Sequence, residues 1–145
     1  MIIKVLPNKI PKIWDLIKLA VTKSNGLVDN AEETLNDLLH SLLSSKSQCF
    51  IRHNEHQEKI NAVVITKIMA NNQTGEKYLL LQTYYAFEAG SDSDWAENMQ
   101  TAIDFAKKEE CSYILCITRN EKIINLAAKY GLKEKHRTLE YRLKG

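Results

Sequence analysis

Residues 78–99, YLLLQTYYAFEAGSDSDWAENM, change their periodicity near the middle of the stretch. The first part, 78–87, is almost continuously apolar, which is typical of a strand buried on both faces of a sheet. After a polar segment, Trp95 and Met99 begin an apolar stripe at helical spacing that continues through Ala102, Ile103 and Ala106. The stretch therefore predicts a strand that leads through a short turn into a helix.

The residues that follow repeat this arrangement. YILCIT, residues 113–118, is a second continuously apolar strand pattern, and a helical stripe formed by Ile123, Ile124, Ala127 and Tyr130 ends at Gly131. A strand–helix–strand crossover joins parallel strands with a nearly fixed handedness. We therefore expect residues 78–87 and 113–118 to be parallel neighbours in one sheet.

The first half of the chain predicts antiparallel pairing instead. Two strand patterns, 48–52 and 60–69, flank a polar connection and suggest a hairpin, and NNQTG at 71–75 suggests a second turn. Further elements are expected as a strand at 2–6, a helix capped by Asn8 and stopped at Asn25-Gly26, a Leu-rich helix at 30–44 and an edge strand at 138–143. The fold class is α/β (α+β), with a mixed, mostly antiparallel sheet and helices on both faces.

Composition limits the classes of function. With 145 residues, 44% of them hydrophobic and 26% charged, the chain reads as one soluble domain spanning 1–145. A net charge of +2 gives no broad basic surface, so nucleic-acid binding is not predicted. No apolar run approaches the length that spans a membrane, and three cysteines in strand-like runs predict reduced thiols. We expect a cytoplasmic protein that does not bind membranes.

The turn between the strand at 78–87 and the following helix is a common type of anion site, because a helix N-terminus presents unpaired N–H groups and a positive dipole end. Here, however, residues 88–97 contain four acidic residues and no basic residue. Asp94 and Glu97 also have the spacing of a capping box, in which Asp94 would take the N–H groups that a phosphate needs. The turn is thus placed like a ligand loop, but its side chains favour self-capping.

The order of elements, together with residues 78–132, resembles the GCN5-related N-acetyltransferase superfamily. The resemblance implies that the pantetheine arm of acetyl-CoA lies in a gap between the two parallel strands. On the matching positions of this sequence, Tyr85, Ala86 and Phe87 would line that gap. The coenzyme's pyrophosphate would bind the helix N-terminus at Gly90, Ser91 and Ser93.

The sequence departs from the family pattern in this loop. The family reads Arg or Gln and then Gly-x-Gly-x-Gly or Ala, whereas residues 90–95 read GSDSDW. Gly90 takes the place of the basic or amide residue, and Trp95 takes the place of a small one. A side chain at such a position crowds an approaching phosphate. The resemblance therefore implies a divergent member with a degraded pyrophosphate loop, similar in its spacing from Asn120 to Gly131 to members from bacteriophages and prophages.

The same resemblance implies the candidate catalytic groups. Family members carry an Asn after the later strand, matched by Asn120, and a Tyr four residues before Gly-Phe that protonates the departing thiolate. Ala127 occupies that Tyr position here, so Tyr130 is the candidate donor, with packing against the sheet as its alternative role. Glu88, at the end of the first strand, is the candidate general base, with a solvated loop residue as the alternative. Arg119 and Asn120 lie where open α/β sheets bind ligands.

No metal site is predicted, because His53 and His56 with Glu55 and Glu58 lack a matching second pair of ligands. Two functions stay open. The first is an acetyltransferase that uses acetyl-CoA and acts on a small-molecule or peptide amine. The second is a non-catalytic module of the same fold that acts through a protein partner, such as a phage-related structural or assembly protein. The sequence does not specify the acceptor or the oligomeric state.

Overall fold

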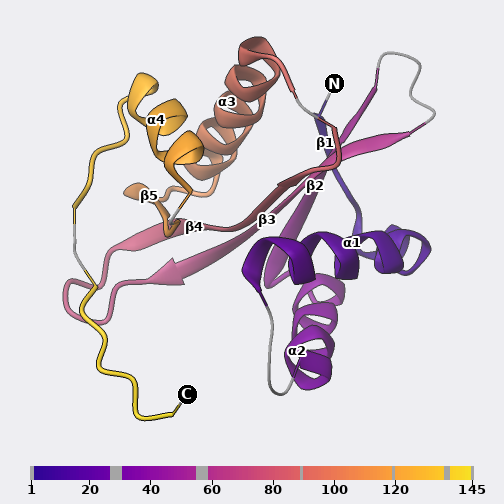
Figure 1. Ribbon diagram of the computed structural model, residues 1–145, viewed down its shortest axis with the longest axis horizontal. Coiled ribbons are helices and arrows are strands. Elements are labelled where there is room, and N and C mark those ends of the chain that lie inside the picture. The colour runs from indigo at the N-terminus through magenta and orange to yellow at the C-terminus, as the bar shows by residue number, and fades with distance from the viewer. Residues whose placement is uncertain are drawn as a thin grey trace.

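The computed structural model of the chain describes residues 2–26, 31–54, 59–88, 90–118, 120–135 and 138–144. Within these residues, one mixed sheet is formed by β1 (Ile2–Lys4), β2 (Ser47–His53), β3 (Ile60–Ala70), β4 (Lys77–Ala86) and β5 (Tyr113–Cys116) (Figure 1). The strands lie in chain order, with antiparallel pairing from β1 to β4 and parallel pairing between β4 and β5. The predicted mixed, mostly antiparallel sheet is confirmed.

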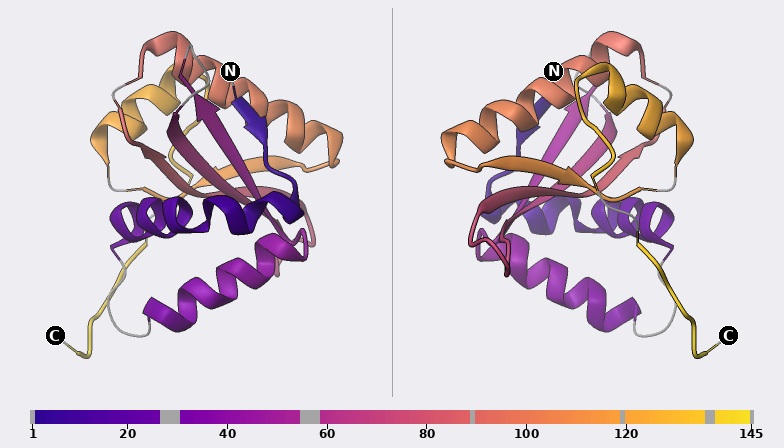
Figure 2. Two further views of the ribbon diagram at one scale, coloured as in Figure 1. Left: turned by 90° about the vertical axis from the view of Figure 1, so that its right-hand side faces the viewer. Right: turned by 90° about the vertical axis from the view of Figure 1, so that its left-hand side faces the viewer.

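Helices cover both faces of this sheet, as predicted. They are α1 (Ile10–Asn25), α2 (Ala31–Leu43), α3 (Asp92–Lys108) and α4 (Glu121–Lys129), with a short 3₁₀ helix, η1 (Pro7–Lys9), before α1. Figure 2 shows α1 and α2 on one face and α3 and α4 on the other. The crossover through α3 makes β4 and β5 the parallel neighbours that the periodicity of 78–118 predicts.

Each face has its own apolar core. Between the sheet and the α1–α2 layer lie fully buried residues that include Ile17, Leu42, Cys49, Val63 and Ile65. On the α3 face, Leu79 packs against Ala102 and Ala106. Phe50 and Phe105 meet edge to face on the same side, with ring centroids 5.6 Å apart. Burial of these side chains is the main favourable contribution to folding.

A β-bulge in β4 changes which side chains face which core. Ile65 of β3 pairs with Thr83 and Thr66 pairs with Leu81, so Gln82 has no partner on β3. The extra residue shifts the alternation of the strand. Leu81 therefore packs in the α3 core, whereas Tyr85 packs against the α1–α2 core.

Two predicted features at the chain ends were wrong. Asn8 does not cap α1, because it lies inside η1, and the residue before α1 is Lys9 with no side-chain cap. Residues 138–144 form no strand, and the apolar side chains of Leu139, Tyr141 and Leu143 are largely exposed. Alternation alone does not make a strand, since a strand needs a neighbour to satisfy its backbone groups.

Candidate active site

The strands β4 and β5 pair over only part of β4. Their parallel register runs from Tyr78 opposite Tyr113 to Leu81 opposite Cys116. Beyond that point β4 continues beside β3 as far as Ala86. Beyond Leu81, β4 has no strand paired with it on the β5 side within the described residues, and we call this side of Tyr84 and Ala86 the free edge of β4.

Peptide groups alternate in direction along that part of β4. Phe87 donates its backbone N–H to the carbonyl of Asn61, with 2.7 Å between N and O. Successive residues of an antiparallel strand point their N–H and C=O groups to opposite sides. We infer that the peptide groups of Tyr84 and Ala86 point to the free edge. The carbonyl of Tyr84 accepts a bond there from Oγ of Ser24 in α1 at 3.4 Å.

Ser91 caps the N-terminus of α3 together with Asp94. The Asp94 amide donates to Oγ of Ser91 at 3.2 Å, and the Ser91 amide donates to Oδ2 of Asp94 at 3.1 Å. This is a complete capping box, but it lies three residues before the predicted Asp94–Glu97 box, which was wrong because α3 already begins at Asp92. Oγ of Ser93 lies 2.9 Å from Oγ of Ser91. The helix α3 is therefore capped by its own side chains, but by Ser91 and Asp94 and not by Asp94 and Glu97.

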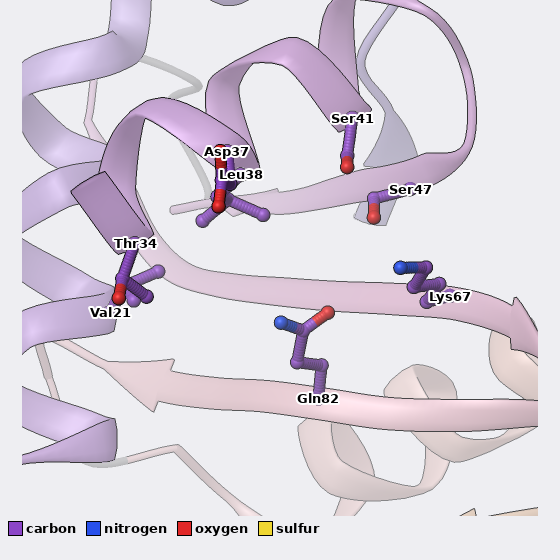
Figure 3. Close-up of a pocket in the computed structure, with 8 residues that line it drawn as sticks. All are labelled: Val21, Thr34, Asp37, Leu38, Ser41, Ser47, Lys67 and Gln82. Carbon is purple, nitrogen blue, oxygen red and sulfur yellow. The ribbon is translucent and has the colours of Figure 1, made fainter.

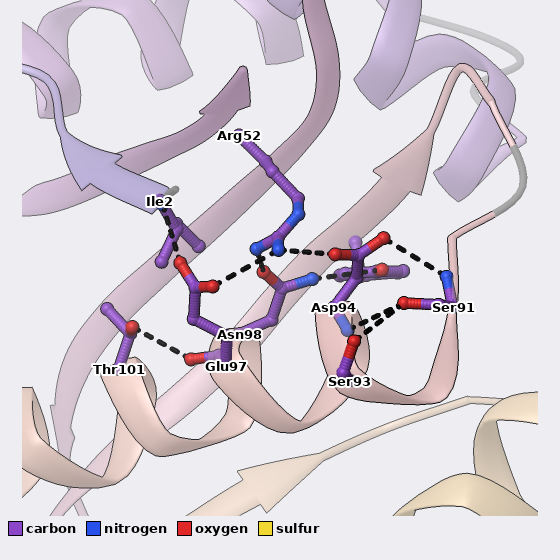
Figure 4. Close-up of polar contacts among 9 residues, drawn as sticks. Ile2, Arg52, Ser91, Ser93, Asp94, Glu97, Asn98 and Thr101 are labelled. Carbon is purple, nitrogen blue, oxygen red and sulfur yellow. Dashed lines mark hydrogen bonds and ion pairs between the residues drawn. The ribbon is translucent and has the colours of Figure 1, made fainter. Parts of the chain in front are cut away.

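A buried arginine holds the acidic residues of this helix start (Figure 4). Arg52 extends from β2, and 8% of its side chain is exposed. Its guanidinium donates to Oδ1 of Asp94 at 2.5 Å, to Oε2 of Glu97 at 3.2 Å and to Oδ1 of Asn98 at 3.1 Å. The three acceptors lie on one side of α3, so the arginine ties the first turns of that helix to the sheet.

The arginine's partners extend the network to two more strands. Glu97 accepts a bond from the backbone N–H of Ile2 in β1 at 2.9 Å. Asn98 donates from Nδ2 to the hydroxyl of Tyr84 in β4 at 3.2 Å. The sheet and α3 are therefore joined through β1, β2 and β4.

These contacts shift the ionisation of the groups involved. The bond from the Ser91 backbone, and then those from Arg52, lower the pKa of Asp94 below its usual value. Partial burial alone would raise the pKa of Glu97, but the bonds from Arg52 and Ile2 hold it below its usual value. Burial raises the pKa of the Tyr84 hydroxyl. Asp94 and Glu97 are thus stabilised as carboxylates beside a guanidinium.

Trp95 of α3 packs against Tyr84 of β4. Its ring meets that of Tyr84 edge to face, with centroids 5.0 Å apart and an interplanar angle of 84°. Its Nε1 is buried and has no hydrogen-bond partner among the described residues. A bulky ring therefore stands in the first turn of α3, where the family pattern has a small residue.

The other predicted coenzyme residues divide between two surfaces. Tyr85 and Phe87 meet edge to face at 5.0 Å and pack against the α1–α2 core, so their side chains face away from α3. Ala86 lies on the free edge of β4. Gly90, Ser91 and Ser93 are exposed beside the start of α3.

Asn120 caps its own helix. Its Oδ1 accepts from the backbone N–H of Lys122 at 2.9 Å and of Ile123 at 3.4 Å, at the start of α4. Its side-chain oxygen is therefore already used within the chain. Arg119, which the sequence analysis paired with it, lies outside the described residues.

The two candidate catalytic residues lie on the surface. Glu88 follows β4 and forms an exposed ion pair with Lys59, with 3.3 Å between Oε1 and Nζ. Tyr130 ends α4, and 37% of it is exposed. No hydrogen bond joins the two side chains among the residues that the structure describes.

A separate pocket opens on the α1–α2 face of the sheet (Figure 3). It has a volume of about 200 Å³ and is lined by residues of α1, α2, β2, β3 and β4: Val21, Thr34, Asp37, Leu38, Ser41, Ser47, Lys67 and Gln82. Gln82 is the bulge residue, which directly follows the last residue of β4 that pairs with β5. The pocket thus lies at the level of the sheet where the pairing of β4 with β5 ends. Its charged lining residues are Asp37 and Lys67.

Sequence reasoning missed Arg52 and Asn98. The strand SQCFIRH contains one charged residue, Arg52. Because a buried arginine needs acidic partners, this residue was a signal that acidic side chains lie nearby. Within the described residues, no group of three His, Cys, Asp or Glu side chains could hold a metal ion, and no helix is long and apolar enough to cross a membrane.

No protein-family model and no curated protein sequence matches the chain. Solved structures match it over nearly its whole length. One described as a "probable acetyltransferase" has a TM-score of 0.75 at 15% identity and covers 99% of this chain and 97% of its own. A "predicted acetyltransferase with acetyl-CoA" from Clostridium acetobutylicum has a TM-score of 0.73 at 16% identity, covering 99% of this chain and 96% of its own. An aminoglycoside 6′-N-acetyltransferase of Acinetobacter baumannii has a TM-score of 0.71 at 13% identity, covering 99% and 97%. The chain therefore has the fold of the GCN5-related N-acetyltransferase superfamily.

Proposed function

We propose that this protein is an acetyltransferase that binds acetyl-CoA mainly along the free edge of β4 and transfers its acetyl group to an amine. The observation that carries the proposal is the end of β4–β5 pairing at Leu81 and Cys116 while β4 continues to Ala86. A strand edge without a neighbouring strand can bind an extended amide-containing chain in the way that it binds a peptide, and here such a chain would compete only with the long bond from Ser24 to the Tyr84 carbonyl. Pantetheine is such a chain, and a protein with the same fold contains acetyl-CoA.

The coenzyme's diphosphate would add little to this binding. Gly90, Ser91 and Ser93 remain the proposed contacts, because they stand at the positive end of the α3 dipole. However, the amides of Ser91 and Asp94 already have partners in the capping box. A phosphate must compete with a carboxylate that is fixed in place.

The acceptor amine would enter through the pocket beside Gln82. In the reaction, the neutral amine attacks the thioester carbonyl, a C–N bond forms and the C–S bond breaks. A base takes one proton from the amine and an acid gives one to the departing thiolate. Glu88 is the proposed base and Tyr130 the proposed acid, and because neither side chain lines this pocket, each would act on the thioester from outside it. Asp37 and Lys67 favour a small acceptor that carries both a positive and a negative group, although a peptide amine is also compatible with an open pocket.

A non-catalytic module that acts through a protein partner is the second candidate. It is favoured by the self-capped start of α3 and by the Trp95 ring at the position of a small residue. Such a module would need neither a phosphate site nor an acid for the thiolate. The two candidates differ in whether the β4 edge binds a thioester.

A thermal-shift titration separates them. We expect stabilisation by acetyl-CoA and by S-acetylpantetheine with affinities within about tenfold of each other, because the diphosphate contributes little. Each ligand should add about 2.7 kcal/mol of stability at a hundredfold excess over its dissociation constant. Adenosine 3′,5′-bisphosphate, which lacks the pantetheine arm, is the matched control and should give no shift. Absence of any shift with both thioesters at millimolar concentration favours the non-catalytic module.

A further inference from the structure

The pocket beside Gln82 is lined by polar side chains that do not satisfy one another. Ser47 is 4% exposed, and its hydroxyl makes no hydrogen bond within the described residues. Lys67 and Asp37 line the same pocket, and neither forms an ion pair in the part of the chain that the structure describes. A hydroxyl, an ammonium and a carboxylate are therefore available to a polar ligand.

The positive and the negative group lie at different parts of this pocket. Ser47 of β2 and Lys67 of β3 are directly opposite each other in the sheet, so their side chains are neighbours on the same face. Figure 3 shows Asp37 apart from this pair, on the other side of the space between α2 and the sheet. An ammonium and a hydroxyl bind a carboxylate, and a carboxylate binds an ammonium. The pocket thus has a place for a carboxylate at Lys67 and one for an ammonium at Asp37.

The size of the pocket limits which molecule can use both places. Its volume is about 200 Å³, whereas pockets for drug-sized ligands measure roughly 300–1,000 Å³. A free α-amino acid combines a carboxylate and an ammonium in one small molecule. A residue inside a peptide has neither charge next to its α-carbon. Charge and volume together favour a free amino acid over a peptide.

The ammonium at Asp37 is not the group that reacts. A nearby opposite charge favours the protonated form of an amine, whereas attack on a thioester requires the neutral form. The reacting amine must therefore be a second one in the same molecule. Gln82 lines the pocket two residues before Tyr84, which belongs to the free edge of β4. An amino acid side chain that passes Gln82 extends toward that edge.

We propose that this pocket binds a free diamino acid, such as lysine or ornithine, with its α-carboxylate at Lys67 and Ser47 and its α-ammonium at Asp37. The side-chain amine extends toward the free edge of β4 and takes the acetyl group. Its nitrogen forms a bond to the carbonyl carbon as the C–S bond breaks, one proton leaves the nitrogen for the base, and the thiolate takes one from the acid. The products are the amino acid acetylated on its side chain and coenzyme A. The transfer step rests on the proposed function, whereas the binding step does not.

Isothermal titration without acetyl-CoA tests the binding step. L-lysine and L-norleucine have the same α-groups and are expected to bind with similar affinity. Cadaverine lacks the carboxylate, and Nα-acetyl-L-lysine amide lacks both charges, so each should bind at least about tenfold more weakly than L-lysine. Equal binding of L-lysine and cadaverine, or no binding of L-lysine at millimolar concentration, overturns the proposal.

Substitutions locate the binding site. Lys67→Met and Asp37→Asn should each weaken L-lysine binding by about tenfold or more. Lys46→Met removes an equal positive charge from the exposed residue before β2, and as the matched control it should bind L-lysine like the unchanged protein. Circular dichroism spectra should be the same for all three variants, because neither Lys67 nor Asp37 forms an ion pair within the described residues. Equal effects of Lys67→Met and Lys46→Met overturn the proposal.

The position of the acetyl group tests the transfer step. The protein is incubated with acetyl-CoA and L-lysine, and fragmentation in a mass spectrometer identifies the acetylated nitrogen. Acetylation of the side-chain nitrogen supports the proposal, and acetylation of the α-nitrogen overturns it. Binding of L-lysine without any product supports the pocket as a binding site and counts against acetyl transfer, so the two proposals fail in distinguishable ways.

Discussion

The guanidinium of Arg52 in β2 holds the carboxylate of Asp94 in the first turn of α3, with 2.5 Å between Nη2 and Oδ1. The same carboxylate accepts the backbone N–H of Ser91 through its other oxygen. One side chain therefore both caps α3 and fastens it to the sheet. The acid that would repel a phosphate at this helix start is also the acid that keeps the helix start in position.

We expect Arg52→Met to lower the free energy of unfolding by about 2–3 kcal/mol at neutral pH. The change removes the donor for Asp94, Glu97 and Asn98 and leaves the two carboxylates close together. Denaturant unfolding followed by circular dichroism measures the loss. Lys18→Met is the control, because the ion pair of Lys18 with Asp15 is exposed, and this variant should lose less than about 0.5 kcal/mol of stability. Equal effects of the two changes would contradict a structural role for the Arg52 network.

The network should also make stability depend on pH in the acid range. The pKa values of Asp94 and Glu97 are lower in the folded protein than usual, so the unfolded chain binds more protons as the pH falls. Their contribution is complete above about pH 5 and is lost as the pH falls through about 4 and below. Arg52→Met should flatten this part of the curve in part, because both carboxylates lose the arginine while Asp94 keeps its bond from the Ser91 backbone and Glu97 keeps its bond from the Ile2 backbone. Parallel curves for the two proteins between about pH 6 and 3 would exclude the network as the source.

A second buried polar contact can be tested with a matched pair of changes. Thr66 is fully buried and donates from Oγ1 to Oε1 of Gln48 at 2.9 Å. Thr66→Val keeps the shape but leaves the Gln48 oxygen without its donor, so we expect a loss of about 1–2 kcal/mol. Thr66→Ser keeps the donor and loses one methyl group, at a cost of about 0.8 kcal/mol. If denaturant unfolding shows the Val change to cost no more than the Ser change, the hydrogen bond does not stabilise the fold.

The sheet and its crossover could be predicted because their signals are local. A continuous apolar run at 78–87 and another at 113–118, separated by one helical stripe, require a parallel pair. The resulting order of strands and helices was sufficient to recognise the fold. Segment 138–143, which forms no strand, shows the limit of this reasoning, because alternation indicates a capacity to form a strand but not the presence of a neighbouring strand.

The details of the candidate site depend on contacts that are distant in sequence. Arg52 lies 42 residues from Asp94 and 45 from Glu97, and a single sequence can indicate that a buried arginine needs acidic partners but not which residues they are. The capping box was misplaced for a related reason, since Ser91–Asp94 and Asp94–Glu97 both have suitable spacing. In the structure, Asp94 forms the capping box with Ser91 and also binds Arg52. The sequence does not show this second contact.

Asp94→Ser tests directly whether self-capping limits coenzyme binding. The change removes one negative charge and frees the Ser91 amide, and it leaves Arg52 with a single carboxylate partner, Glu97. Loss of about 1.4 kcal/mol of repulsion at short range should tighten acetyl-CoA binding about tenfold, whereas S-acetylpantetheine, which has no diphosphate, should bind as before. Asp92→Ser removes an equal charge from the same turn without disturbing the cap, and should tighten acetyl-CoA binding only about twofold. Isothermal titration of both variants with both ligands measures the difference. Equal gains for the two ligands, or for the two variants, would show that the Asp94 cap does not control access of the diphosphate to α3.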